Sequence, residues 1–206
     1  MVTYAEFLTF LPGEFSVQIT GLFRCKSTPS GHIALRTEIP HALWMSDELS
    51  IRHELRCGDL GRIISLHGKA YEPLGGYGLR FEAFVAQTIA DFILDNDAHG
   101  RIWLAERSGA LVGSSAIVLH ENGTGQLRWV VVDPAERGDG LGKDLVARAL
   151  AYCRDQGCRS VHLETTDGLP ESEDMYNKLG FYITSNTIEE LWDGTRPLIR
   201  MQLDLA

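Results

Sequence analysis

The feature that most constrains the fold is a hydrophobic strand that runs straight into a glycine-rich turn. The apolar stretch Gln126–Asp133 is followed by three alternating glycines within Gly138–Gly142, and a helical pattern then begins. Glycine lets backbone N–H groups approach an anion without an intervening Cβ. The helix N-terminus adds unpaired donors and the positive end of its dipole, and Arg137 and Lys143 add charge. This stretch predicts a cradle for a pyrophosphate.

Two common phosphate-binding loops do not fit the same stretch. A P-loop requires glycine where the chain has Arg137, and Ser or Thr where it has Asp144. A dinucleotide fingerprint requires its third glycine one residue beyond Gly142. The cradle therefore belongs to another class of phosphate-bearing ligand.

Around the cradle, helical and strand patterns alternate along the chain. The expected order is β-α-α-β-β-β-α-β-α-β-β, which predicts an α/β fold with a central mixed β-sheet and helices on both faces. Strands are expected over Leu49–Arg56, Arg101–Arg107, Ala110–His120, Gln126–Asp133, Ser160–Thr165, Phe181–Glu190 and Pro197–Leu205. Helices are expected over Asp59–His67, Phe81–Phe92, Asp139–Gln156 and Pro170–Leu179.

Composition excludes several classes of protein. A formal charge of −9 disfavours nucleic acid as a partner, although it suits a cationic amine. No apolar run approaches the roughly 20 residues that span a bilayer, so no membrane partner is expected. The four cysteines form no C-x-x-C pair and no cluster with histidine, which argues against a metal site and for reduced thiols in a cytoplasmic protein. The N-terminus also lacks the basic stretch of a secretory signal.

The first 44 residues differ from the rest. They show weak periodicity and no clear cap signals, whereas an ordinary domain pattern begins after Met45. We expect an N-terminal extension over 1–44 and one domain over 45–206. Met45 as the true start and a loosely packed extension are both open readings.

Two motifs carry a resemblance to a known family. The pattern R-x-x-G-x-G at Arg137, Gly140 and Gly142 resembles the acetyl-CoA-binding motif of the GNAT superfamily. A second segment, from Tyr176 to Phe181, looks like the Y-x-x-x-G-F signature that ends the next helix in that family. The stretches CGDLGRIISLHGKAY at Cys57–Tyr71 and FEAFVAQTIADF at Phe81–Phe92 most closely resemble the acetyltransferase half of MarR-type regulator–acetyltransferase fusions. We do not expect its winged-helix half here, since 44 residues are too few to form it.

The resemblance implies acetyl-CoA as co-substrate, no metal, and a set of cofactor-binding positions. By position, the strand residues Val130 and Val132 would present backbone groups to pantetheine, and Asp139 would point to solvent. Leu169 and Ser172 replace the asparagine and alanine common in the family, so cofactor contacts from them are in doubt. The expected cofactor-binding residues are Val130, Val131, Val132, Arg137, Gly138, Asp139, Gly140, Leu141, Gly142 and Lys143.

The resemblance also implies catalytic roles. Tyr176 occupies the position of the tyrosine that commonly protonates the departing thiolate. Glu82, on the second helix, is the leading candidate for the base, and three other residues remain open: Glu164, His120 and His162. Tyr71 and Tyr77 are candidates for the acceptor pocket. The expected activity is N-acetyl transfer to an amine of a small molecule, peptide or protein.

Two other functions stay open beside an enzyme. One is a sensor that holds acetyl-CoA without turnover, and the other is an interaction module that uses the fold structurally. The sequence also leaves a homodimer open.

Overall fold

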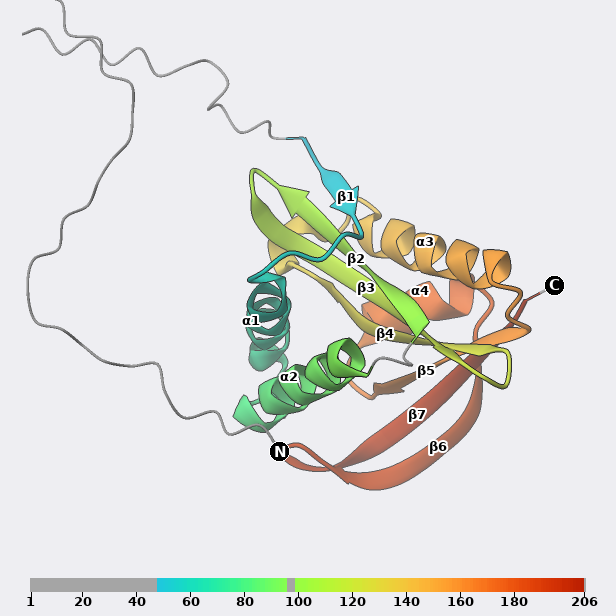
Figure 1. Cartoon of the computed structure of the whole chain (residues 1–206). Coiled ribbons are helices and arrows are strands. Elements are labelled where there is room, and N and C mark those ends of the chain that lie inside the picture. Colours follow the sequence, from blue (N-terminus) through green and yellow to red (C-terminus); the bar gives the residue numbers. More distant parts are fainter. Residues whose placement is uncertain (1–47, 96–98, 206) are drawn as a thin grey trace, which may run out of the picture. The chain divides into compact units, whose positions relative to one another are not determined.

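The fold is a seven-stranded sheet with two helices on each face, seen in a computed structural model that describes residues 48–95 and 99–205 (Figure 1). The strands are β1 (Ser50–Arg52), β2 (His99–Arg107), β3 (Ala110–His120), β4 (Thr124–Val132), β5 (Ser160–Thr166), β6 (Tyr182–Leu191) and β7 (Gly194–Asp204). The helices are α1 (Asp59–Tyr71), α2 (Leu79–Leu94), α3 (Leu141–Asp155) and α4 (Pro170–Lys178), with short 3₁₀ turns at Glu72–Leu74 and Pro134–Glu136. The predicted order of elements is confirmed.

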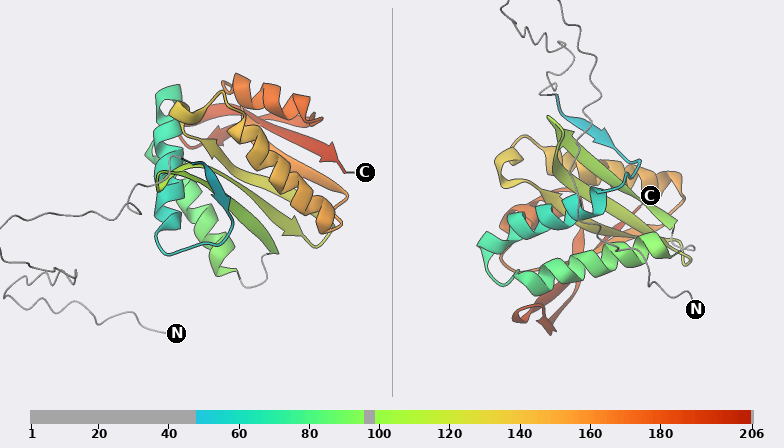
Figure 2. Two further views of the ribbon diagram at one scale, coloured as in Figure 1. Left: turned by 90° about the horizontal axis from the view of Figure 1, so that it is seen from above. Right: turned by 60° about the vertical axis from the view of Figure 1, so that its left-hand side comes forward.

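The sheet is mixed, as predicted. Its strand order is β1-β2-β3-β4-β5-β7-β6, and every neighbouring pair is antiparallel except β4 and β5, which are parallel. Helices α1 and α2 lie on one face and α3 and α4 on the other (Figure 2). The long β6–β7 hairpin forms one end of the sheet (Figure 1).

Each face of the sheet has its own apolar core. On the α1–α2 side, Ile63, Ile89 and Trp129 belong to one cluster of buried side chains. On the α3–α4 side, Leu145, Val161 and Met201 belong to the other. Strand alternation explains this division, because successive side chains of a strand point to opposite faces.

Some element ends differ from the sequence prediction. Strand β1 ends at Arg52 rather than at residue 56, and α1 continues through Gly68 to Tyr71. Helix α3 begins at Leu141 rather than at Asp139, because Gly140 takes a left-handed φ of 81° and caps the helix. Propensity alone does not favour Gly68 inside a helix, but packing of α1 against the sheet and α2 outweighs that cost.

A buried ion network joins β1, α1 and β2. The Arg52 guanidinium donates to both Asp59 oxygens, at 2.7 and 2.8 Å, and to Glu106 at 3.0 Å. Arg62 pairs with Glu106 at 2.6 Å. Asp59 is only 2% exposed, so its charge depends on these partners. Hydrogen bonds from Arg52 hold the pKa of both carboxyl groups below their ordinary values. This network fixes α1 to the sheet.

Two sequence predictions concern residues that the structure does not describe. These are the N-terminal extension over 1–44 and the start of the domain at Met45. No helix within the described ranges is long and apolar enough to cross a membrane.

Candidate functional site

The sheet opens between its two parallel strands. Strands β4 and β5 pair at only three positions, from Thr124 with Ser160 to Gln126 with His162. Beyond Gln126, β4 has no strand partner on its β5 side, so the backbone of its second half is accessible from there. The Val130 carbonyl accepts a hydrogen bond from the Tyr71 hydroxyl at 3.2 Å. This opening is where a ligand can bind along β4.

A bulge changes the direction of β4 at the same place. Ser114 of β3 faces Val131 and Ala116 faces Arg128, so β4 carries one extra residue between these pairs. Trp129 takes a positive φ of 46°, a strained conformation for a bulky residue. The Ser114 hydroxyl donates to the Trp129 carbonyl at 2.7 Å in a buried position, which stabilises the bulge.

The first cavity, called the donor cavity below, lies between this part of β4 and the N-terminus of α3. It has a volume of about 490 Å³. Gly138 and Gly140 line it with left-handed φ angles of 101° and 81°, and a Cβ at either would meet no atom within 4 Å. The first N–H groups of α3, starting at Leu141, have no partner within the helix. This backbone geometry fits a bound phosphate.

Most of the expected cofactor-binding residues line the donor cavity. These are Val130, Val131, Val132, Arg137, Gly138, Gly140, Leu141, Gly142 and Lys143. Asp139 is exposed and is not part of the lining. Sequence reasoning missed Lys178 of α4, a third cation in the lining, which also pairs with Asp174 at 2.6 Å. Its proximity depends on how α4 packs, which no local pattern shows.

The second cavity, called the acceptor cavity below, lies on the α1–α2 side of the opening and has a volume of about 350 Å³. Aromatic rings from three parts of the chain form one wall. Tyr77 precedes α2, Phe81 belongs to α2, and Trp192 belongs to the β6–β7 turn. Phe81 and Trp192 have ring centroids 4.8 Å apart. Tyr71 also lines this cavity, so both tyrosines expected at the acceptor pocket are there.

The two cavities meet at four shared residues. Tyr71, Val130, Leu169 and Ser172 line both of them. Burial raises the pKa of Tyr71 to about 12, so this hydroxyl is protonated at neutral pH. Leu169 and Ser172, the two departures from the family pattern, therefore sit at the junction.

Tyr176 lies in the acceptor cavity next to this junction. It is 7% exposed, and its ring packs edge-on against Phe181 at 5.7 Å. Burial raises the pKa of Tyr176, and Tyr71 adds to the effect. No hydrogen bond from the described residues holds its hydroxyl. A protonated, unbound hydroxyl at this place can donate a proton.

The structure separates the four candidate bases. Glu164 of β5 lines the acceptor cavity, and Arg200 donates to its Oε1 at 2.5 Å. Glu82 does not line the cavity: its carboxylate lies over Gly68 of α1. The physical reason is helical spacing, since Phe81 and Val85 face the cavity and Glu82 points about 100° away from Phe81.

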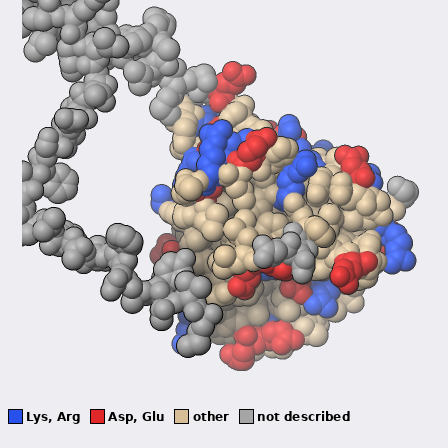
Figure 3. Space-filling model, in the orientation of Figure 1, with Lys and Arg blue, Asp and Glu red and all other residues tan. Residues whose placement is uncertain are grey.

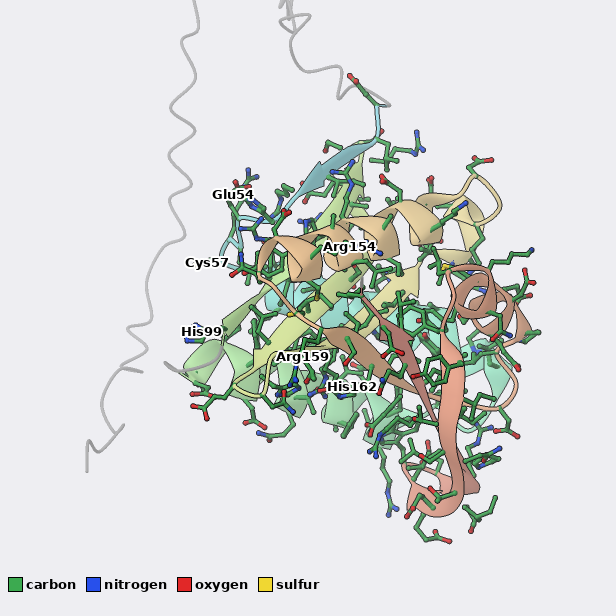
Figure 4. All side chains as sticks on the ribbon, turned by 90° about the vertical axis from the view of Figure 1, so that its right-hand side faces the viewer. Glu54, Cys57, His99, Arg154, Arg159 and His162 are labelled. Carbon is green, nitrogen blue, oxygen red and sulfur yellow. The ribbon has the colours of Figure 1, made fainter. Side chains whose placement is uncertain are left out.

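The two histidines lie further along the sheet. His120 and His162 stack with ring centroids 5.6 Å apart, and neither lines the acceptor cavity. In Figure 4, His162 on β5 and Arg154 on α3 lie on opposite sides of the sheet. A third histidine, His67, does line the cavity, and burial lowers its pKa to about 4. It is therefore neutral at pH 7.

Within residues 48–95 and 99–205, no group of three or more His, Cys, Asp or Glu side chains is arranged to hold a metal ion.

The fold and the two cavities define a class of protein: an α/β domain with an opened sheet and two cavities that meet at the opening, one of them formed at a glycine-rich helix N-terminus. Within that class, the chain belongs to the acetyltransferase (GNAT) family. The profile of this family matches residues 67–181, more than half of the chain. The predicted superfamily is confirmed.

Individual relatives agree with this assignment. The chain is 33% identical over 131 residues to glucosamine 6-phosphate N-acetyltransferase of Trypanosoma brucei brucei, covering 60% of this chain and 82% of that enzyme. It is 35% identical over 95 residues to N-acetyltransferase family 8 member 2 of Rattus norvegicus, covering 44% and 42%. The chain spans about half or less of the length of several curated relatives that it matches.

Solved structures show the same fold. An acetyltransferase of the GNAT family from Staphylococcus aureus Mu50 superposes with a TM-score of 0.63 at 17% identity, covering 77% of this chain and all of that one. The predicted fold class is confirmed.

Proposed function

We propose that this chain is an acetyl-CoA-dependent N-acetyltransferase that works by direct attack of an amine in a ternary complex. One observation carries the proposal: the donor and acceptor cavities meet at Tyr71 and Val130, beside the buried hydroxyl of Tyr176. A pure sensor of acetyl-CoA needs only the donor cavity, and an interaction module needs neither. The presence of both cavities with an acid between them supports an enzyme.

The donor cavity is proposed to bind the pyrophosphate and pantetheine of acetyl-CoA, which supplies an acetyl thioester. The α3 N-terminus with Gly138 and Gly140 would hold the phosphates, with charge from Arg137, Lys143 and Lys178. The opened edge of β4 at Val130 and Val132 would present backbone groups to the pantetheine. Holding two reactants at one junction makes the encounter effectively intramolecular.

Two groups are proposed to handle the protons. Tyr176 gives one to the leaving sulfur, because burial keeps its hydroxyl protonated and nothing else among the described residues engages it. Glu164 receives one from the amine, since it is the one carboxylate among the described residues that lines the acceptor cavity. Glu82 remains a proposal from sequence, but its position over α1 gives it no direct path to the amine.

Further parts of the proposal concern setting and partners. The trypanosome relative is named for a small amino sugar, which supports a small-molecule amine as acceptor; a peptide remains the alternative. Acidic and basic side chains intermingle on the face drawn in Figure 3, and the net charge is −9, so we include no nucleic acid partner. A cytoplasmic setting fits the free thiols of Cys57, Cys153 and Cys158. A domain over 45–206, kinship with MarR-type fusions and a homodimer stay proposals from sequence.

The test combines binding with turnover. Acetyl-CoA at about 100 times its Kd should stabilise the full chain by about 2.7 kcal/mol through mass action, while ATP and NAD should not. Release of free CoA thiol with a panel of amines then separates an enzyme from a sensor. An equal shift from ATP would refute the donor site, and acetyl-CoA binding without thiol release from any amine would favour the sensor.

A further inference from the structure

The acceptor cavity contains a positive charge without a partner. Arg128 of β4 lines this cavity and is half-buried. Within the described part of the chain, no carboxylate lies within ion-pair distance of the Arg128 guanidinium, and the guanidinium donates no hydrogen bond. Burial lowers the pKa of Arg128 and the charge of Glu164 raises it, but Arg200 already pairs with that carboxylate at 2.5 Å. A half-buried guanidinium without an anion is costly, so the site is suited to an anionic group of a ligand.

Strand alternation places Arg128 on the α1–α2 face, and the bulge follows directly after it. Arg128 faces Ala116 across the sheet and Val131 faces Ser114, so both residues share the α1–α2 face although they are three apart. Trp129, at the bulge, also packs on that face. The Arg128 guanidinium lies 5.0 Å from the centroid of the Trp129 ring, which holds it over the cavity floor.

The aromatic wall of the cavity has a different chemistry. It consists of the packed rings of Tyr77, Phe81 and Trp192, with centroids 4.8 to 5.8 Å apart. Phe84 extends this wall toward solvent, at 45% exposure and 5.5 Å from Trp192. Such a wall favours a large apolar or aromatic group on the ligand.

We propose that the acceptor is a small amine that carries a carboxylate and a large apolar side chain, as an aromatic α-amino acid does. Its carboxylate binds Arg128, its side chain packs on the aromatic wall, and its amine points to Val130 at the junction. Arg128 and Val130 are two residues apart, about 7 Å along the strand, which suits an amine and a carboxylate in one small molecule. This inference rests on the proposed function and names the substrate class of the same site.

The same charges disfavour a polyamine. Within residues 48–95 and 99–205, Glu164 is the one carboxylate that lines the cavity, and it is already paired with Arg200. A polycation would therefore meet the unpaired charge of Arg128. The cavity volume of about 350 Å³ is also at the small end of ligand pockets.

The test compares substrates that differ by one group on the full chain. L-phenylalanine and 2-phenylethylamine share the ring and the amine, but only the first has a carboxylate; glycine has the carboxylate without the ring. Thiol release should give a kcat/KM at least tenfold higher for L-phenylalanine than for either of the others. Arg128→Met should lower kcat/KM for L-phenylalanine by about 10- to 100-fold, the range of a hydrogen bond to a charged group. The same substitution should leave kcat/KM for 2-phenylethylamine within about threefold of the wild-type value.

A matched variant and two further substrates complete the test. Arg148→Met removes an exposed arginine of α3 that pairs with Asp144 outside both cavities. This variant should leave kcat/KM unchanged for both substrates. Equal losses for both substrates in Arg128→Met would overturn the carboxylate contact. Preference for spermidine or glucosamine 6-phosphate, or no thiol release from any carboxylate-bearing amine, would overturn the substrate class. If acetyl-CoA still raises the thermal midpoint in those cases, the donor site stands; if it does not, the proposed function itself fails.

Discussion

The donor and acceptor cavities share the edge of β4, yet the chain builds them in different ways. The donor cavity depends mainly on one continuous segment, residues 130–143, and on backbone groups that glycines leave accessible. The acceptor cavity combines side chains from α1, α2, α4, four strands and the β6–β7 turn. A site made of local backbone can bind the same donor in many relatives, whereas a site made of distant side chains is free to change its specificity.

The largest expected effect comes from closing the donor cavity. Gly140→Glu places a carboxylate where a phosphate is expected to bind. Two like charges about 4 Å apart near a surface repel by about 4 kcal/mol, so the acetyl-CoA Kd should rise by about 10³-fold. Isothermal titration or the ligand-induced thermal shift measures this change.

The chain offers a control with the same backbone strain. Gly157, at the other end of α3, has a φ of 73° against 81° for Gly140. Gly157→Glu should cost similar stability but leave acetyl-CoA binding unchanged. If both variants bind acetyl-CoA with the same Kd, the glycine turn does not form the donor site, and the proposed contrast between the cavities is lost.

The next effect concerns the frame of the acceptor cavity. Asp59→Asn removes a nearly buried charge and leaves Arg52 without its main partner, which should lower the free energy of unfolding by about 3 kcal/mol at pH 7. Because α1 also carries His67, which lines the acceptor cavity but not the donor cavity, the KM for the amine should rise more than the acetyl-CoA Kd. Urea unfolding and steady-state kinetics measure the two effects.

The pH dependence of this difference has a definite sign. Hydrogen bonds from Arg52 lower the pKa of folded Asp59 below its ordinary value of 3.8. Its contribution is therefore fully present above the unfolded-state pKa and is lost as the pH falls through the lower folded value. The difference in the free energy of unfolding between wild type and Asp59→Asn should shrink below about pH 4. Asp144→Asn, which breaks an exposed pair with Arg148, should cost less than about 1 kcal/mol.

A smaller effect is expected at the junction of the two cavities. Tyr176→Phe removes the proposed acid but keeps the ring against Phe181, so kcat should fall by about 10²-fold with acetyl-CoA binding unchanged. Because burial raises the pKa of Tyr176 above its ordinary value of 10, the wild-type rate should not decline through this group below pH 10. Tyr152→Phe on α3, outside both cavities, is the matched control. A loss of less than tenfold with normal melting would mean that the acid lies elsewhere.

The smallest effect tests the rim of the donor cavity. Lys178→Gln removes an exposed cation, so the acetyl-CoA Kd should rise only about threefold at low ionic strength and converge on wild type near 1 M salt, where the Debye length is about 3 Å. Lys69→Gln on α1, exposed and outside both cavities, should have no effect. A salt-independent change in Lys178→Gln would indicate a structural role.

The sequence predicted the order of elements and the donor segment well because both rest on short-range patterns. The alternation of Gln126–Asp133, the glycines before α3 and the proline that starts α4 are each readable within about ten residues. Tyr176 was assigned through its family motif. Element ends were less accurate, as in α1, because packing decided that Gly68 remains helical.

The acceptor site was harder to predict, and Glu82 and Arg128 show why. Glu82 has the right residue type on the right helix, but the rotation of α2 directs it toward Gly68. Arg128 stands within an ordinary strand pattern, and the cavity around it is formed by side chains of α1, α2 and β5 that are distant in the sequence. Neither the rotation of a helix nor the distant elements that enclose a strand residue leave a clear periodic signal in a single sequence.

The sequence by itself determined the mixed α/β order and the anion cradle, since a strand, three glycines and a helix start are set by local backbone preferences. The tertiary structure alone decided that β4 and β5 separate after Gln126, that Leu169 and Ser172 sit where the cavities meet, and that no carboxylate among the described residues forms an ion pair with Arg128. These properties depend on how segments far apart in the chain pack and pair, and that information is shared among many residues rather than carried by any one motif.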